Sequence, residues 1–170
     1  TRANYARGED TYDPILSKAV VFLETNEEVS KILSLCNEHK IPVVPFGTGT
    51  SLEGNVVGND KGITISLEKM NKILKVNAED FDCRVQACVT KEQLNEYLRE
   101  DGVFFPIDPG ANAAIGGMAS TSASGTMAVK YGTMKTVITG LTVVLPNGDI
   151  INTGSRTKKT SAGYNLTNLF

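Results

Sequence analysis

The residues best suited to chemistry lie in a glycine-rich stretch at positions 45–54, with the sequence PFGTGTSLEG. Glycines let a backbone turn tightly and let its N–H groups approach an anion, so this composition is typical of a pyrophosphate cradle. The dinucleotide fingerprint would need a glycine where Leu52 stands, and a P-loop would need a lysine at Asn55. From the residues alone, a ligand loop and a plain turn at a strand end are equally supported. Three hydroxyl side chains add donors, namely Thr48, Thr50 and Ser51.

A second stretch, from Asp108 to Gly132, is poor in side chains that form a core. Eleven of the 23 residues from Gly110 to Gly132 are glycine or alanine. Such a segment is costly to order unless its backbone comes close to something flat or extended. A flexible surface loop is the alternative, although the stretch is poor in the Lys, Glu and Pro that are typical of disorder, with one Lys, one Pro and no Glu.

The sequence shows no spacing of His and Cys residues that is typical of a metal site or of a catalytic nucleophile. The single histidine, His39, has no neighbour at a metal-ligand spacing and forms no Ser-His or Cys-His pair with the visible residues. The cysteines are odd in number and lack the paired spacing of zinc or redox sites, so a structural role is favoured for Cys36, Cys83 and Cys88. The sequence therefore assigns no catalytic residue and no metal ligand.

Length and charge exclude several classes of protein. A chain of 170 residues with 41% apolar residues is expected to form one compact domain or two small lobes without disulfides or metals. The 17 basic and 19 acidic residues disfavour a nucleic-acid-binding protein. No apolar run is long enough to span a membrane, and no signal segment is visible, so the chain is expected to be soluble. It begins at Thr1 and stops at Phe170 in mid-pattern, so we expect a fragment.

The elements around the first stretch can be predicted from local signals. Ala19–Phe22 is an apolar run suited to a strand, and a capping box at Thr25 and Glu28 predicts a helix that ends near His39, before Pro42. A strand over 42–46 then leads directly into the glycines. This strand, helix and strand fit a parallel crossover, and the carboxyl end of a parallel strand is where α/β sheets bind ligands.

The remaining elements are expected to be more antiparallel. A helix should run from the capping box at Thr90 to Gly102, and Asn147-Gly148 is a strong hairpin signal. Strands are expected at 62–67, 73–76, 83–89, 137–145 and 150–153.

Five ordered motifs together carry a family resemblance, from Ala19 nearly to the end of the chain. The motifs are PFGTGTSLEG, FPIDPGANAAIGGMASTSASG, VKYGTM, GLTVVLPNGDII and SAGYNLTNLF. In order and spacing they resemble the FAD-binding domain of the vanillyl-alcohol-oxidase-type (PCMH-type) flavoproteins. Within that family they are most similar to the cytochrome-linked D-lactate dehydrogenases and the glycolate oxidase subunit.

The resemblance implies an α+β fold of two α+β lobes with FAD extended between them. A small parallel β-α-β lobe would occupy residues 1–66, and a larger, mainly antiparallel sheet with helices would occupy 67–170, truncated before the substrate domain. Backbone N–H groups of the first loop would hold the pyrophosphate, and the second stretch would lie along the flavin and ribityl parts. The backbone of Ile138, at the head of the hairpin strand, would contact the adenine. The implied cofactor-binding residues are Pro45, Phe46, Gly47, Thr48, Gly49, Thr50, Ser51, Pro109, Gly110, Gly116, Gly117, Ser122, Gly125 and Ile138.

Two positions depart from the family pattern. Relatives that bind flavin covalently carry a histidine where Thr50 stands, so the resemblance implies non-covalent FAD here. Many relatives carry asparagine where Ser122 stands, although a serine hydroxyl can still donate one hydrogen bond. Because half of the flavin pocket's cover would come from the part that is not present, we expect this fragment to bind FAD weakly.

The implied activity is that of a flavin-dependent D-2-hydroxy-acid dehydrogenase that oxidises D-lactate to pyruvate. The substrate-binding half, with a divalent metal, would follow Phe170, and cytochrome c or a quinone would accept the electrons. The implied location is mitochondrial in a eukaryote, and otherwise cytoplasmic or peripheral to the inner membrane. A D-2-hydroxyglutarate dehydrogenase or glycolate dehydrogenase subunit is an alternative, and so is a non-catalytic interaction module that keeps the flavin fold. A basic cluster (Arg156, Lys158, Lys159) fits either a solvated loop or contact with a phosphate or an electron acceptor.

Overall fold

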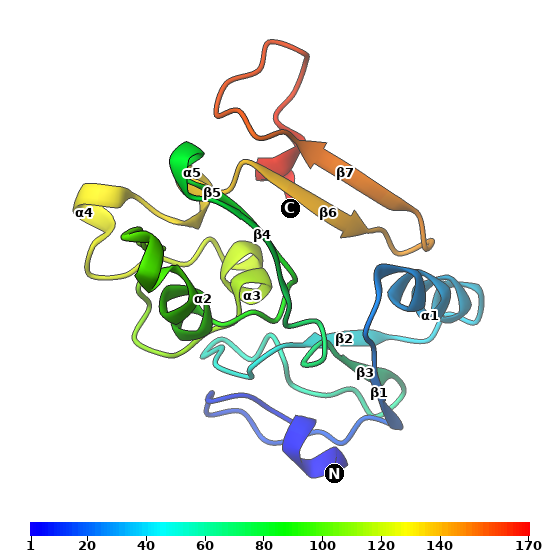
Figure 1. Ribbon diagram of the computed structural model, residues 1–170. Coiled ribbons are helices and arrows are strands. Elements are labelled where there is room, and N and C mark those ends of the chain that lie inside the picture. The colour runs from blue at the N-terminus through cyan, green and yellow to red at the C-terminus, as the bar shows by residue number, and fades with distance from the viewer. The chain divides into compact units, whose positions relative to one another are not determined.

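The computed structural model describes residues 1–170, which fall into two compact units. Unit 1 comprises Thr1–Met70 with Val144–Ile150, and unit 2 comprises Asn71–Val143 with Ile151–Phe170. A three-stranded parallel sheet lies in the first, and an antiparallel strand pair with several helices lies in the second (Figure 1). The predicted α+β fold class is confirmed.

The sheet of unit 1 contains β1 (Ala19–Phe22), β2 (Val43–Phe46) and β3 (Ile63–Ser66) in the order β1-β3-β2. Both pairings are parallel, as the predicted crossover requires. The third strand lies between the other two, and its last three residues are buried. Buried Thr64 is satisfied by a 2.8 Å hydrogen bond between its hydroxyl and that of Ser17, which lets a polar residue occupy the central strand.

Helix α1 (Asn26–Glu38) packs against this sheet, as Figure 1 shows. Its first turn is capped as predicted, because Thr25 Oγ1 accepts a 3.2 Å hydrogen bond from the backbone N–H of Glu28. Its buried face joins a core cluster made of Leu23, Val29, Ile65 and Met70. The helix thus connects β1 to β2 so that both strands run parallel to β3, and the glycine-rich loop follows the carboxyl end of β2.

Unit 2 begins with the antiparallel strands β4 (Ile73–Asn77) and β5 (Asp82–Val85), joined through a 3-10 turn at Ala78–Asp80. The prediction that the second strand continues to residue 89 is wrong. The side chain of Gln86 accepts a 2.9 Å hydrogen bond from Lys72 N, and the N–H of Val89 donates to the Gln86 carbonyl at 3.2 Å. These bonds close a turn at the end of the ladder.

Helix α2 (Lys91–Leu98) follows that turn and ends in a 3-10 turn at Arg99–Asp101. The predicted cap is confirmed, with Thr90 Oγ1 accepting from Gln93 N at 3.2 Å, and Gly102 adopts a left-handed φ of 68° at the end. The buried face of α2 forms a cluster made of Val89, Leu94 and Leu98.

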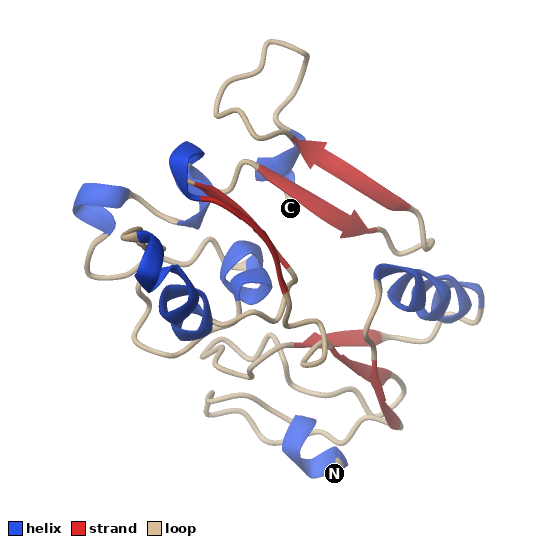
Figure 2. Cartoon of the chain, in the orientation of Figure 1, coloured by secondary structure: helices blue, strands red, loops and turns tan.

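The small-residue stretch folds into short helices, so the flexible-loop alternative is wrong (Figure 2). These helices are α3 (Ile115–Ser120), α4 (Ala128–Tyr131) and α5 (Met134–Val137). Two methionines anchor them, because Met118 and Met134 pack with Ile107 in a cluster in which each is 1% exposed. Sparse but well-placed apolar residues therefore order a segment that is mostly glycine and alanine.

The predicted hairpin is present as β6 (Gly140–Val144) and β7 (Ile150–Gly154). Its turn is closed by a 2.8 Å hydrogen bond from Leu145 N to the Asp149 carbonyl, and Gly148 has a φ of 92°. The prediction that the strand begins at residue 137 is wrong, because α5 occupies that position. Ile138 therefore ends a helix and does not stand at the head of the strand. Short 3-10 helices at Arg2–Tyr5 and Leu166–Leu169 lie near the two termini.

Candidate cofactor-binding site

The first glycine-rich loop leaves the carboxyl end of β2 with a row of backbone donors that the chain does not use. No hydrogen bond within the chain takes up the N–H groups of Gly47, Gly49, Thr50 or Ser51. Backbone N–H groups that are buried are nearly always paired, and these partly buried donors are free to pair with water or with a ligand. Donors grouped in this way form a concave site for an anion, which fits a pyrophosphate.

Phe46 supports this loop from inside unit 1. Its ring is buried and meets the ring of Tyr5 edge to face, with the centroids 5.0 Å apart. Gly49 lies above that ring with a φ of 73°, and a Cβ there would be 2.7 Å from Phe46 Cζ. Glycine is therefore required at 49 by both its conformation and its packing. Pro45 lies exposed in β2 opposite Ile65, and a cofactor contact of either Pro45 or Phe46 remains a prediction.

The hydroxyl side chains of the loop help to hold its shape. Ser51 Oγ donates to Asn55 Oδ1 at 2.9 Å and accepts from Glu53 N at 3.4 Å. The hydroxyl oxygens of Thr48 and Thr50 are 3.3 Å apart. Asn55, whose presence excludes a P-loop, thus helps to hold the conformation of this loop.

The second stretch is held in unit 2 by the carboxylate of Asp108, which was not among the predicted site residues. Asp108 Oδ2 accepts a 2.6 Å hydrogen bond from the hydroxyl of Thr126, and Oδ1 accepts a 3.1 Å bond from the N–H of Met127. These bonds, that from Thr126 first, hold the pKa of Asp108 below its usual range. A Cβ on Gly125 would lie 2.2 Å from Asp108 oxygens, so Gly125 is required for this close approach. Asp108 is about twenty positions from Thr126 and Met127, so no local sequence pattern predicts these hydrogen bonds.

The glycines of the second stretch divide into two kinds. A Cβ at Gly116 would lie 2.8 Å from the Cβ of Ala87, whose carbonyl already accepts the Gly116 N–H at 2.7 Å. Added Cβ atoms at Gly110 and Gly117 would have no neighbour within 4 Å. Packing within the chain therefore explains Gly116 but neither Gly110 nor Gly117. An open glycine is the arrangement expected where a bound molecule approaches the backbone.

The other predicted positions lie in unit 2 with clear local roles. Ser122 is exposed and adopts a left-handed φ of 48°, a conformation that asparagine and glycine tolerate better than serine does. The carbonyl of Pro109 accepts a 3.3 Å hydrogen bond from Lys91 Nζ. Ile138 packs its side chain against the cluster around Met134, so any cofactor contact there would come from its backbone.

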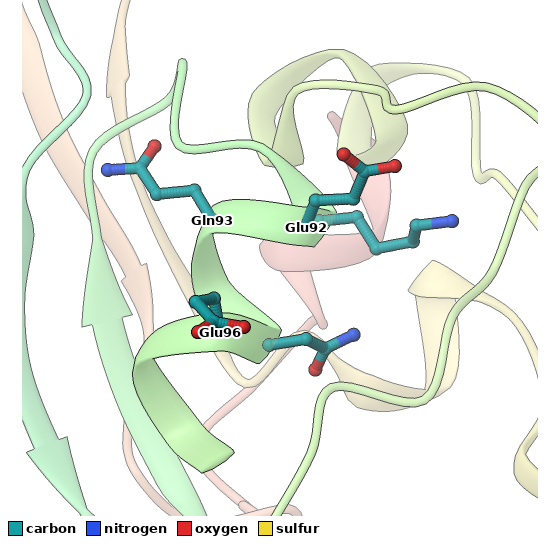
Figure 3. A pocket seen from close by; sticks show the side chains of 5 residues that line it. Glu92, Gln93 and Glu96 are labelled. Atoms are coloured by element: carbon teal, nitrogen blue, oxygen red, sulfur yellow. The ribbon is translucent and has the colours of Figure 1, made fainter.

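A surface depression on α2, with a volume of about 590 Å³, is drawn in Figure 3. Its lining contains none of the predicted cofactor-binding residues and consists of Lys91, Glu92, Gln93, Asn95 and Glu96. In Figure 3 the side chains of Glu92 and Gln93 leave the first turn of the helix in different directions.

Several of these lining side chains are already occupied by neighbouring segments of unit 2. Asn112 Nδ2 donates to Glu92 Oε2 at 2.9 Å, and the N–H of Phe105 donates to Asn95 Oδ1 at 2.7 Å. Gln93 Nε2 donates to the carbonyl of Asn71 at 2.8 Å. Helix α2 is thus hydrogen-bonded to the segment that leads into the second glycine stretch, and these bonds use side chains that line the depression.

Comparison with known proteins indicates which type of ligand this domain binds. The sequence model of one protein family, described as FAD binding domain, matches residues 17–154. The chain belongs to this family. Its cofactor is FAD, and the unpaired N–H groups after β2 and the open glycines at 110 and 117 fit such a ligand.

Curated relatives carry the names of flavoenzymes. The chain is 48% identical to a "Probable D-lactate dehydrogenase, mitochondrial" of Danio rerio, over 99% of this chain and 35% of the relative. It is 49% identical to a "D-lactate dehydrogenase [cytochrome], mitochondrial" of Arabidopsis thaliana, over 88% of this chain and 26% of the relative. The chain therefore spans about a third or less of the length of these relatives.

Among solved structures, an alkyldihydroxyacetonephosphate synthase superposes with a TM-score of 0.83 at 21% identity, over 99% of this chain and 32% of that one. This likeness shows the fold. No helix in this structure has the length and apolar character needed to cross a bilayer. No group of three or more His, Cys, Asp or Glu side chains is placed to hold a metal ion.

Proposed function

We propose that this chain is the FAD-binding part of a flavin-dependent D-2-hydroxy-acid dehydrogenase that oxidises D-lactate to pyruvate. The observation that carries the proposal is the row of unpaired backbone donors at Gly47, Gly49, Thr50 and Ser51, directly after a parallel strand. The names of the relatives favour D-lactate over other 2-hydroxy acids.

Each predicted site residue has a proposed role toward the cofactor. The N–H groups of residues 47–51 bind the pyrophosphate, with Pro45 and Phe46 at the base of the loop. The backbone of Ile138 meets the adenine. The residues proposed to lie along the flavin and ribityl parts are Pro109, Gly110, Gly116, Gly117, Ser122 and Gly125.

The chemistry is divided between the cofactor and the protein. Bound FAD supplies a hydride acceptor for the carbon that carries the substrate hydroxyl. The residues of this chain bind and orient the cofactor and keep its phosphates paired with backbone donors. Thr50 stands where covalent relatives carry histidine, and a threonine hydroxyl forms no such flavin bond, so the FAD is held non-covalently. The groups that remove the hydroxyl proton, and a divalent metal beside them, belong to the remainder of the full-length enzyme.

The same proposal assigns a partner and a location. Electrons pass from the flavin to cytochrome c or to a quinone, and the Arabidopsis relative has cytochrome in its name. In a eukaryotic source the enzyme is mitochondrial, as the names of both relatives state for those proteins. In a bacterial source it is cytoplasmic or peripheral to the inner membrane.

The test uses the full-length protein. Purified enzyme should show flavin absorbance, release all of its flavin into the supernatant after acid precipitation, and be reduced faster by D-lactate than by D-2-hydroxyglutarate or glycolate. L-lactate serves as the control substrate. A protein that binds no flavin contradicts the proposal outright. One that binds FAD but is reduced by none of the acids supports a non-catalytic module, and a higher rate with glycolate or D-2-hydroxyglutarate reassigns the substrate.

A further inference from the structure

The segment Ala6–Ser17, called here the N-terminal strap, packs directly on the pyrophosphate loop. The N–H of Glu9 donates a 2.9 Å hydrogen bond to the carbonyl of Gly49. Gly8 lies so close that a Cβ there would be 2.5 Å from the Gly49 carbonyl oxygen and 2.9 Å from that of Ser51. The strap therefore touches the loop at the residues whose N–H groups are proposed to hold the phosphates.

The strap also contacts the far end of the loop. A Cβ on Gly54 would lie 2.8 Å from the ring of Tyr12, and one on Gly58 would lie 2.0 Å from the carbonyl oxygen of Ile15. The N–H of Gly58 donates to the carbonyl of Ala6 at 2.9 Å. Residues 49–58 are thus held along their length by a segment that precedes the first strand.

A buried carboxylate fixes the turn of the strap. Asp10 is 7% exposed and takes part in no salt bridge. Its Oδ2 accepts from Gly8 N at 3.1 Å, and its Oδ1 accepts from Tyr12 N at 3.0 Å. A carboxylate is costly to bury unless hydrogen bonds satisfy it, so these two bonds are a strong constraint on the backbone from 8 to 12.

The peptide bond between residues 49 and 50 connects the strap to the cofactor. The carbonyl of Gly49 and the N–H of Thr50 belong to one planar trans unit and point in opposite directions. A bond from Glu9 that holds this carbonyl toward the strap therefore turns the Thr50 N–H away from the strap. The orientation of a proposed phosphate donor is set by a residue outside the loop.

We propose that the N-terminal strap is a positioning element for the FAD pyrophosphate, with Asp10 and Gly8 as its positioning residues. This inference rests on the proposed function, since it takes the loop at 47–51 to be the pyrophosphate site. The family match begins at residue 17, so the strap up to residue 16 lies outside the matched domain.

The test compares four variants of the full-length protein. Gly8→Ala pushes on the two loop carbonyls, Asp10→Ala removes both hydrogen bonds, and Asp10→Asn keeps one acceptor oxygen. Asp13→Asn is the matched control, because Asp13 is exposed and makes no hydrogen bond. FAD binding to the apoprotein should weaken about tenfold in Gly8→Ala and Asp10→Ala, by less in Asp10→Asn, and not at all in Asp13→Asn.

A second readout separates positioning from general stability. Riboflavin lacks the pyrophosphate, so its affinity should be the same in all four variants as in the wild type. Equal weakening of riboflavin and FAD, or wild-type FAD affinity in both Gly8→Ala and Asp10→Ala, overturns the inference. If Asp10→Ala does not fold, Asp10→Asn and Gly8→Ala decide by the same criteria. A wild-type protein that binds no FAD refutes the proposed function itself, whereas tight wild-type binding with insensitive strap variants refutes only the strap.

Discussion

The open glycine of α3 offers a test in which stability and cofactor binding should move in opposite directions. Replacing Gly117 by alanine adds a methyl group that meets no atom of the chain within 4 Å. Alanine is better than glycine in a helix by roughly 0.5–1 kcal/mol. At about 2–4 °C per kcal/mol for a protein of this size, the apoprotein should melt roughly 1–4 °C higher. If FAD occupies that space, the methyl group overpacks the site by about 1–3 kcal/mol, which weakens FAD binding about 5- to 150-fold.

The neighbouring Gly116 supplies a matched comparison for the effect on stability alone. In Gly116→Ala the new Cβ would lie 2.8 Å from the Cβ of Ala87 and 2.9 Å from its carbonyl oxygen. Overpacking of this kind costs about 1–3 kcal/mol, so this apoprotein should melt lower despite the gain in helix propensity. Calorimetry of the apoproteins and fluorescence titration with FAD measure both effects. The reasoning is refuted if Gly117→Ala lowers the melting temperature or binds FAD as tightly as the wild type does.

Three further predictions concern single side chains. Ser122→Gly should raise the free energy of unfolding by about 1 kcal/mol, measured with urea, because Ser122 has a φ of 48° and glycine has no left-handed penalty. Arg156→Gln should remove the hydrogen bonds from Arg156 to Asp82, at 2.6 and 2.8 Å, which hold the pKa of that carboxyl below its usual range. The variant should therefore be less stable than the wild type at neutral pH. Thermal melts should show this difference shrinking as the pH falls through the lowered pKa of Asp82, and also shrinking with added salt. Burial raises the pKa of the Cys36 thiol, and partial desolvation with the nearby charge of Asp82 raises that of Cys83, whose surface is still exposed. Iodoacetamide at neutral pH should therefore modify Cys83 slowly and reach the buried Cys36 only on unfolding, as peptide mass spectrometry would report. Fast labelling of Cys36 in the native protein would contradict this.

Elements with local signals could be predicted from the sequence. The capping threonines at 25 and 90, the Asn-Gly turn and the helix-ending Gly102 each act within a few residues, and each is found where the sequence places it. Helix α3 was not predicted, because its small residues give no amphipathic pattern. The helix is held by long-range packing of Met118 against Met134 and Ile107, which the local sequence does not indicate.

Part of the candidate site could likewise be predicted from the sequence, and part depends on contacts made only in the folded chain. The sequence pointed to both glycine stretches, since glycine content is visible residue by residue. It could not tell Gly116, which Ala87 requires, from Gly117, which nothing in the chain requires. It also passed over Asp10 and Asp108, because a carboxylate that organises a loop is identified by its hydrogen bonds, and these depend on how the chain folds.

The hairpin tip has a consequence for the order in which the protein folds as it is made. The segment Val144–Ile150 belongs to unit 1 but follows Asn71–Val143 of unit 2 in the chain. Ser30 Oγ donates a 2.5 Å hydrogen bond to the carbonyl of Gly148 in this segment. Val144 packs against the core cluster beneath α1. A ribosome that has released the chain only as far as Met70 has delivered the whole parallel sheet but not the segment that completes its core. Domains generally fold as units during synthesis, and the complete core of unit 1 is available only after most of unit 2 has emerged. A cut after residue 70 therefore leaves unit 1 without part of its own core, and an expression boundary for this unit has to include the hairpin.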